Sequence, residues 1–171
     1  MTESQRLQEY AAAADPVAAP GLAEEEFTEA ATDHTVWSCV GNLTAVRSIR
    51  ARVRDVLEGV RLPGGPVPAD SIDDAELAAS ELATNALLHS RSGQVGGVMT
   101  LSIRTERGLV RVAVADQGEK SAEAGPDDEL RDADGDYGRG KLIIESCTSR
   151  SGEYRGEGTH VAWCESDLPE S

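Results

Sequence analysis

The spacing of apolar residues predicts two helices between residues 43 and 90. The second is expected to begin at Asp70 or Ser71, both common N-cap residues, and to carry Ala75 and Ala79 in a stripe of small residues on its core side. PGGPVP at residues 63–68 separates the two helices as a loop. The first helix is marked by apolar residues that return to one face, namely Leu43, Val46, Ile49, Val53, Val56, Leu57 and Val60.

The rest of the pattern is that of strands. Residues 35–40 form an apolar run that ends at Gly41-Asn42, and residues 98–104 and 109–115 predict a hairpin around Gly108. Because helices come early and strands late, we expect an α/β (α+β) two-layer sandwich. Its sheet would be mixed, mostly antiparallel, and covered by helices on one face. The remaining elements expected are a helix at residues 139–147 and strands near residues 149–155 and 159–165.

The charged residues are unevenly distributed along the chain. The chain has 171 residues, enough for one domain with tails, and a net charge of −15. Residues 1–33 carry −7, residues 116–138 another −7 and the last seven residues −3, so the remainder is close to neutral. We expect an acidic, disordered tail at residues 1–33, a domain at residues 34–165 and a C-terminal tail at residues 166–171. Acidic tails and an acidic loop argue against direct binding to nucleic acid.

Other features exclude further classes of protein. No stretch approaches the roughly 20 apolar residues that cross a membrane, and the start MTESQRLQEY lacks the pattern of a signal peptide. We therefore expect a cytoplasmic protein with no membrane partner. The histidines form no metal or catalytic set, and His160 is expected to pack in a strand or to face water. Small buried side chains without disulfide or zinc are expected at Cys39, Cys147 and Cys164.

The second predicted helix carries polar residues on one face. Glu81, Asn85 and His89 are spaced i, i+4 and i+8, so they line up along the helix. A carboxamide can ligate Mg²⁺ beside phosphate oxygens, and a carboxylate one turn away can accept a proton from a nucleophile. A solvated helix face would give the same pattern, so Glu81 and Asn85 alone do not decide the function.

Three short motifs follow the second predicted helix, and each lies at the start or the end of a predicted strand or helix. In Asp116-Gln117-Gly118 a carboxylate ends an apolar strand, where it can accept a hydrogen bond from an exocyclic amine while the glycine allows close approach of a flat ring. Gly138-Arg139-Gly140 opens a helix, whose free N–H groups favour anions. Gly158-Thr159 precedes the last strand. The first and the last of these motifs also fit an ordinary turn.

Taken in order, these motifs resemble a family. SELATNALLH on a helix, D-x-G at a strand end, GRG at a helix start and GT before a strand are similar to the pattern of the GHKL (Bergerat-fold) ATPase superfamily. The resemblance is to the small serine/threonine kinase branch that contains anti-sigma factors, and it covers residues 34–165. It implies the Bergerat ATP-binding fold, which is the fold of histidine-kinase-like ATPase domains.

The resemblance also implies a role for each matching residue. Glu81 would be the catalytic residue that activates the nucleophile, and Asn85 the ligand of Mg²⁺. Asp116 would read the adenine amino group, and Thr159 would support adenine through water. Residues 119–137 would form the ATP lid, ending at the glycines near the phosphates. The full nucleotide-binding set implied for ATP or ADP is Asn85, Asp116, Gly118, Gly138, Arg139, Gly140 and Thr159.

The sequence departs from the family pattern in its lid and directly after the glycine motif. Lys141 follows the glycine motif where an apolar residue is usual, and it either neutralises phosphate charge or points outward. Lys120 stands where a glycine is common. The acidic lid disfavours a triphosphate unless magnesium or a partner compensates. We therefore expect modest nucleotide affinity.

The family resemblance implies an ATP-dependent protein serine/threonine kinase. Its substrate would be a STAS-domain antagonist of an anti-sigma factor, a sigma factor would be the regulated target in transcription, and relatives imply a homodimer. The alternative is a catalytically silent switch that binds adenine nucleotide and sequesters a partner; Glu81→Gln should abolish transfer in the first case and change little in the second. A histidine kinase would need an upstream phospho-accepting histidine, and residues 1–33 contain none. Loss of nucleotide binding on a retained fold is disfavoured by Asn85 and Asp116.

Overall fold

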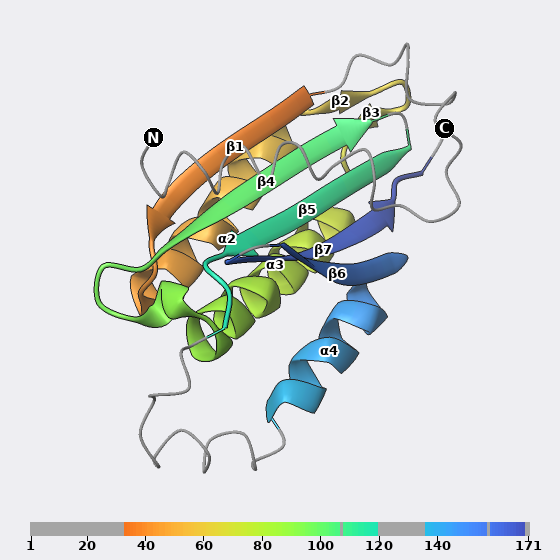
Figure 1. The fold of residues 1–171 in the computed structure, drawn as a ribbon. Coiled ribbons are helices and arrows are strands. Elements are labelled where there is room, and N and C mark those ends of the chain that lie inside the picture. Colours follow the sequence, from red (N-terminus) through yellow and green to blue (C-terminus); the bar gives the residue numbers. More distant parts are fainter. Residues whose placement is uncertain (1–32, 107, 120–135, 157, 170–171) are drawn as a thin grey trace.

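The computed structural model describes residues 33–106, 108–119, 136–156 and 158–169. They form a two-layer α+β sandwich in which helices cover one face of a five-stranded sheet (Figure 1). The sheet contains β1 (Asp33–Val40), β4 (Val98–Glu106), β5 (Leu109–Asp116), β6 (Arg150–Gly156) and β7 (Thr159–Asp167). The helices are α2 (Leu43–Gly59), α3 (Ala69–His89) and α4 (Asp136–Cys147), with a small ribbon of β2 (Arg61–Leu62) and β3 (Gly65–Pro66).

The sheet order is β1-β4-β5-β7-β6. Each pair of neighbours in this sheet is antiparallel, where the sequence allowed a mixed sheet. The predicted fold class, a two-layer α+β sandwich with helices on one face, is confirmed. β5 lies at the centre of the sheet, so Asp116 at its end has a strand on either side and α3 against the helix-covered face.

The helix that carries the polar face begins earlier than the sequence suggested. Pro68 occupies its N-cap position and Ala69 is its first residue, so the expected caps Asp70 and Ser71 lie inside the first turn. Proline is tolerated there because the N–H that it lacks would have had no partner within the helix. α2 has an ordinary cap, since the side chain of Asn42 accepts a hydrogen bond from the Ala45 N–H.

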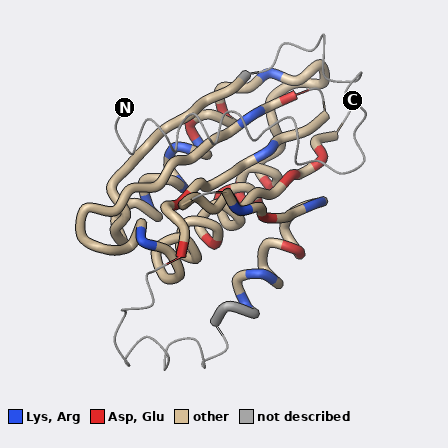
Figure 2. Tube along the Cα trace, in the orientation of Figure 1, with Lys and Arg blue, Asp and Glu red and all other residues tan. Residues whose placement is uncertain are grey.

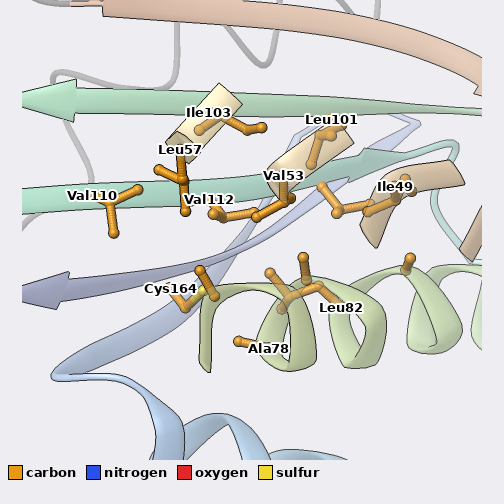
Figure 3. Close-up of a cluster of buried hydrophobic side chains, with 14 of the residues drawn as sticks. Ile49, Val53, Leu57, Ala78, Leu82, Leu101, Ile103, Val110, Val112 and Cys164 are labelled. Carbon is orange, nitrogen blue, oxygen red and sulfur yellow. The ribbon is translucent and has the colours of Figure 1, made fainter. Parts of the chain in front are cut away.

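The main core lies between the sheet and α2 and α3 (Figure 3). Small residues of α3 are buried and let the helix lie close to the strands. They include Ala75 and Ala79, as the small-residue stripe predicted, and also Ala78. Burial raises the pKa of Cys164 to about 12, so this thiol behaves as a small apolar side chain. Cys39 and Cys147 are partly exposed, contrary to expectation. Labelled members of the core are Ile49, Val53, Leu57, Leu82, Leu101, Ile103, Val110 and Val112.

The opposite face of the sheet holds a smaller apolar cluster and a buried ion pair. Arg111 Nη1 lies 3.2 Å from Glu165 Oε1, and both side chains are almost fully buried. The guanidinium of Arg111 also stacks over the ring of Trp163, 4.6 Å from its centroid. Glu165 accepts a second hydrogen bond from Arg150 Nε at 2.9 Å, so both carboxylate oxygens have a cationic partner.

The charges of the described residues are nearly balanced (Figure 2). They contain sixteen acidic and twelve basic residues, so most of the net charge of −15 belongs to residues outside them. Those outside include residues 120–135 of the predicted lid and residues 1–32 of the predicted tail. Folded structure extends past the expected boundary at residue 165, since β7 ends at Asp167 and Leu168 is buried. None of the described helices has the length and apolar character that a membrane crossing requires.

Candidate functional site

A pocket of about 380 Å³ opens where the second half of α3 meets the ends of β5, β6 and β7. Three residues of the predicted nucleotide-binding set line it: Asn85 from α3, and Asp116 and Gly118 from the end of β5. The pocket is therefore built by two of the predicted motifs, which lie far apart in the sequence. Its other lining residues are Leu82, Ala86, His89, Ser90, Glu119, Glu153, Arg155, His160 and Ala162.

The segment that follows α3 holds the Asp116–Gly118 loop in place. The backbone N–H of Arg91 donates to Gly118 O at 2.9 Å, and the Arg91 guanidinium donates to Gln117 O. Ser92 Oγ accepts from the Gln117 N–H at 2.9 Å, while Gln117 Oε1 accepts from the Val98 N–H at the same distance. Because both the helix and the loop are fixed to this segment, the spacing between the α3 face and Asp116 is set by the fold.

Gly118 is a position that a side chain could not occupy without strain. Its φ is +80°, in the left-handed region that favours glycine. A Cβ there would lie 3.2 Å from the carbonyl carbon of Gly158 and 3.5 Å from Thr159 N. The glycine therefore packs against the turn before β7, whereas the sequence interpretation gave it close approach to a flat ring.

The structure does not bring Thr159 into the pocket. This residue is the first of β7, is buried, and is absent from the pocket lining. Its neighbour His160 lines the pocket instead, since successive side chains of a strand point to opposite faces. The register also pairs His160 with Asp116 on β5.

Asp116 is 3% exposed and both of its carboxylate oxygens have partners. Oδ1 accepts from the Gly118 N–H at 2.8 Å, and Oδ2 lies 2.9 Å from His160 Nδ1. The other ring nitrogen of His160 lies 3.0 Å from Glu153 Oε2. The hydrogen bond to Asp116 is the main reason that the pKa of His160 is raised, with Glu153 adding to the effect and partial burial opposing it. His160 lies in β7 and is partly buried, as expected, but its contacts with two carboxylates were not predicted.

The predicted catalytic residue Glu81 and the predicted magnesium ligand Asn85 lie beside the pocket, against α4. A Cβ on Gly140 would lie 2.9 Å from Glu81 Oε2 and 3.6 Å from Asn85 Oδ1, so α3 and α4 approach each other at this glycine. Asn85 faces both this contact and the pocket, whereas Glu81 is absent from the pocket lining. The two side chains share the helix face that their spacing predicted.

α4 begins two residues before the glycine motif. Its first residue is Asp136, so Gly138 and Arg139 fall in the first turn and Gly140 is the fifth residue. The first four N–H groups of a helix lack partners within it, and Gly140 lies just beyond them. The N–H groups that could meet an anion thus belong mainly to residues before Gly140. Arg139 and Lys141 are both exposed, so Lys141 points outward in this structure.

The oxygen atoms of the Asn85 and Glu81 side chains suit a cation that is also coordinated by a bound ligand. Mg²⁺ prefers oxygen ligands and usually keeps waters and phosphate oxygens beside one or two protein groups. Asn85 offers a carboxamide oxygen at the pocket, with the Glu81 carboxylate nearby. Among the residues that the structure describes, no group of three or more His, Cys, Asp or Glu is placed to hold a metal ion by itself. The site therefore fits Mg²⁺ that arrives with phosphate.

Comparison with known proteins agrees with this architecture. The family model of the histidine kinase-like ATPase domain matches residues 41–164. Among solved structures, the chain is similar to the crystal structure of the RsbU and RsbW domains of Rv1364c from Mycobacterium tuberculosis, with a TM-score of 0.55 and 20% sequence identity. The match covers 80% of this chain and 32% of that one, so the chain spans about a third of that protein's length and shares its fold over that part. No curated protein matches the chain.

Proposed function

Because the chain belongs to the histidine kinase-like ATPase domain family, we propose that its pocket binds ATP with Mg²⁺ and that it acts as a serine/threonine protein kinase of the anti-sigma-factor type. The observation that carries the proposal is the convergence of Asn85 and Asp116 on one pocket from two separate elements. A kinase of this kind needs a polar group for the base at one end and a group for magnesium and phosphate at the other. Asp116 and Asn85 supply these two ends.

The base would bind at Asp116. This carboxylate is held by the Gly118 N–H and by His160, and each carboxylate oxygen can still accept a further hydrogen bond. An exocyclic amine such as that of adenine is a suitable donor, whereas a carbonyl oxygen at the same position of a base would be repelled. The apolar part of the lining, from Leu82, Ala86 and Ala162, suits the faces of a flat ring.

The phosphates would lie toward Asn85 and α4. Magnesium, when bound with the nucleotide, would supply charge neutralisation at the transferred phosphoryl group. Asn85 would hold it through the carboxamide oxygen, and Glu81 would accept the proton of the attacking serine hydroxyl. As the serine oxygen forms a bond to the γ-phosphorus, the bond from that phosphorus to the β–γ bridging oxygen breaks and ADP leaves. The N-terminal turn of α4, with Gly138 and Arg139, would face the phosphates.

The partner would be a STAS-domain antagonist, and the regulated target a sigma factor. The support is the sequence resemblance to the anti-sigma branch together with the shared fold with a structure that contains an RsbW domain. The family resemblance also favours a homodimer. A cytoplasmic site of action agrees with these partners.

One observation favours a second function, a silent nucleotide-binding switch. Glu81 lies against Gly140 of α4 and is absent from the pocket lining, so its carboxylate does not face the pocket where the nucleotide would bind. If it cannot reach a substrate hydroxyl, the protein would bind nucleotide and sequester its partner without transferring phosphate.

Glu81→Gln separates the two functions. Wild type and variant are incubated with γ-labelled ATP, Mg²⁺ and a STAS-domain protein from the same organism, and labelled phosphoserine is measured alongside ADP affinity. The kinase proposal expects transfer to fall by about 10²–10⁴-fold while ADP affinity is retained, because removal of a general base affects the chemical step. A wild type that binds ADP but transfers no phosphate would support the switch.

A further inference from the structure

His160 lines the pocket and stands between two carboxylates, one of which is Asp116 of the candidate base site. β7 lies between β5 and β6 in the sheet, so a side chain on its pocket face has a neighbour on each side. For His160 these neighbours supply Asp116 Oδ2 at 2.9 Å from Nδ1 and Glu153 Oε2 at 3.0 Å from Nε2. The imidazole is 18% exposed, while the side chain of Asp116 is almost completely buried.

Both contacts together require a particular protonation state. A carboxylate only accepts hydrogen bonds, and a neutral imidazole has one N–H and one lone pair. A neutral His160 could donate to Asp116 or to Glu153, and its lone pair would then face the other carboxylate. The protonated ring donates to both. The raised pKa of His160, caused first by its hydrogen bond to Asp116, agrees with this geometry.

We propose that protonated His160 is the positioning residue of Asp116, and that the affinity of this protein for adenine nucleotides falls when His160 loses its proton. The inference rests on the proposed nucleotide site. His160 holds Oδ2 while the Gly118 N–H holds Oδ1, so the carboxylate that receives the adenine amine keeps one orientation. His160 acts on the bound base through Asp116. It thus has the supporting role that the sequence analysis predicted for Thr159.

The surrounding charges set the direction of the effect. The pocket face of β6 contributes Glu153 and Arg155, and the segment after β5 contributes Glu119, which forms an ion pair with Arg155. α3 contributes His89. Without the charge on His160, the lining contains three carboxylates and one arginine. Such a pocket disfavours an anionic nucleotide. Loss of the proton therefore weakens binding in two ways: Asp116 is no longer held in place, and the more negative pocket repels the phosphates.

The test is the affinity for ADP in the presence of Mg²⁺, measured by calorimetry from pH 6 to pH 9. His160→Asn keeps a donor toward Asp116 but cannot be protonated, so its profile keeps every pH-dependent contribution of wild type except that of His160. We expect wild-type affinity to fall about tenfold more than that of His160→Asn across this range, the scale of one hydrogen bond to a charged group. His160→Ala is expected to bind about tenfold more weakly than wild type at pH 6.

Glu153→Gln gives an independent readout. It removes one of the two carboxylates that favour the protonated ring, so the midpoint of the wild-type profile should move to lower pH. Asp74→Asn removes an exposed carboxylate of α3 outside the pocket and should leave the midpoint in place. NMR titration of the His160 ring gives the same comparison without nucleotide, and adding ADP should raise the pKa of His160.

Two outcomes would overturn the inference in distinguishable ways. If wild type binds ADP in an Asp116-dependent manner but shares the pH profile of His160→Asn, His160 does not position Asp116 and the nucleotide site stands. If wild type binds no ADP at any pH, the proposed function fails and this inference fails with it. A purely structural role for His160 would lower the melting temperature of its variants without separating their pH profiles.

Discussion

Gly140 is the residue at which α4 approaches Glu81, the predicted catalytic residue, and Asn85, the predicted magnesium ligand. Alanine there would place a methyl group 2.9 Å from Glu81 Oε2, so the carboxylate must move away. Displacement of a catalytic group by about 1 Å can cost around 100-fold in rate, so we expect Gly140→Ala to lower phosphotransfer by about 10- to 100-fold. Folding should be retained or slightly stabilised, because alanine is favoured over glycine inside a helix by up to about 1 kcal/mol.

A phosphotransfer assay and a thermal melt on the same samples measure both effects. Gly59→Ala is the matched control, since a Cβ on Gly59, the last residue of α2, meets nothing within 4 Å. Equal phosphotransfer by Gly140→Ala and wild type would contradict the expectation that this position of the Glu81 carboxylate controls the reaction.

His160 also links folding stability to pH. Its pKa is raised in the folded protein, so folding favours the protonated ring. The resulting stabilisation is complete below the ordinary histidine pKa and is lost as pH rises through the higher folded-state pKa. We expect the free energy of unfolding of wild type, relative to His160→Asn, to be larger at pH 6 than at pH 9. Urea unfolding at the two pH values measures it, and a constant difference would contradict the assignment.

At the scale of single residues, the sequence identified groups that belong to motifs and missed one that depends on strand register. Asn85, Asp116 and Gly118 were predicted and line the pocket. His160 was missed because its importance comes from lying opposite Asp116 across β5 and β7. A shift of one residue in that register would bring the next side chain to the pocket, and local sequence does not fix the register.

At the scale of elements, β6 and β7 pack closely where Gly152 of β6 lies beside Trp163 of β7. A Cβ on Gly152 would lie 2.7 Å from the indole of Trp163, which is 6% exposed and stacks on Arg111. Because a buried ring cannot move freely, we expect Gly152→Ala to destabilise the protein by about 1–3 kcal/mol. The neighbouring exposed residue provides the control, Ser151→Ala, which should change stability by less than about 0.5 kcal/mol. Urea unfolding compares them, and equal stability of the two variants would rule out this close packing.

At the scale of elements, the order of α2, α3, α4 and the strands of the five-stranded sheet could be predicted. Their ends could not, and neither could the short β2–β3 ribbon, which lies where the sequence predicted a loop. α3 begins at Ala69 with Pro68 at the cap position, and α4 begins at Asp136 rather than at the glycine motif. The interior of a helix is set by repeated apolar burial, which the sequence displays. Its first residue depends on a single cap, and several neighbouring residues can serve there.

At the scale of the whole molecule, the site is a consequence of topology. The order β1-β4-β5-β7-β6 places β5 in the middle of the sheet, where the segment after α3 fixes the loop that follows it. Asp116 and Asn85 thereby meet across a pocket that neither motif could form alone. Fold class was accessible from the order of helices and strands. The pairing of β5 with β7 was not, because antiparallel pairing between distant strands leaves no local signal.

The most direct test of the nucleotide site is calorimetry of ADP and ATP, with and without Mg²⁺, on wild type and on Asp116→Ala. The site predicts binding by wild type, and loss of at least about tenfold in affinity when Asp116 is removed, since a hydrogen bond to a charged group is lost. It also predicts that Mg²⁺ strengthens the binding of ATP, because Asn85 holds the ion beside the phosphates. Absence of binding at millimolar nucleotide, or equal binding by Asp116→Ala, would contradict it and leave an ATPase fold used for another purpose.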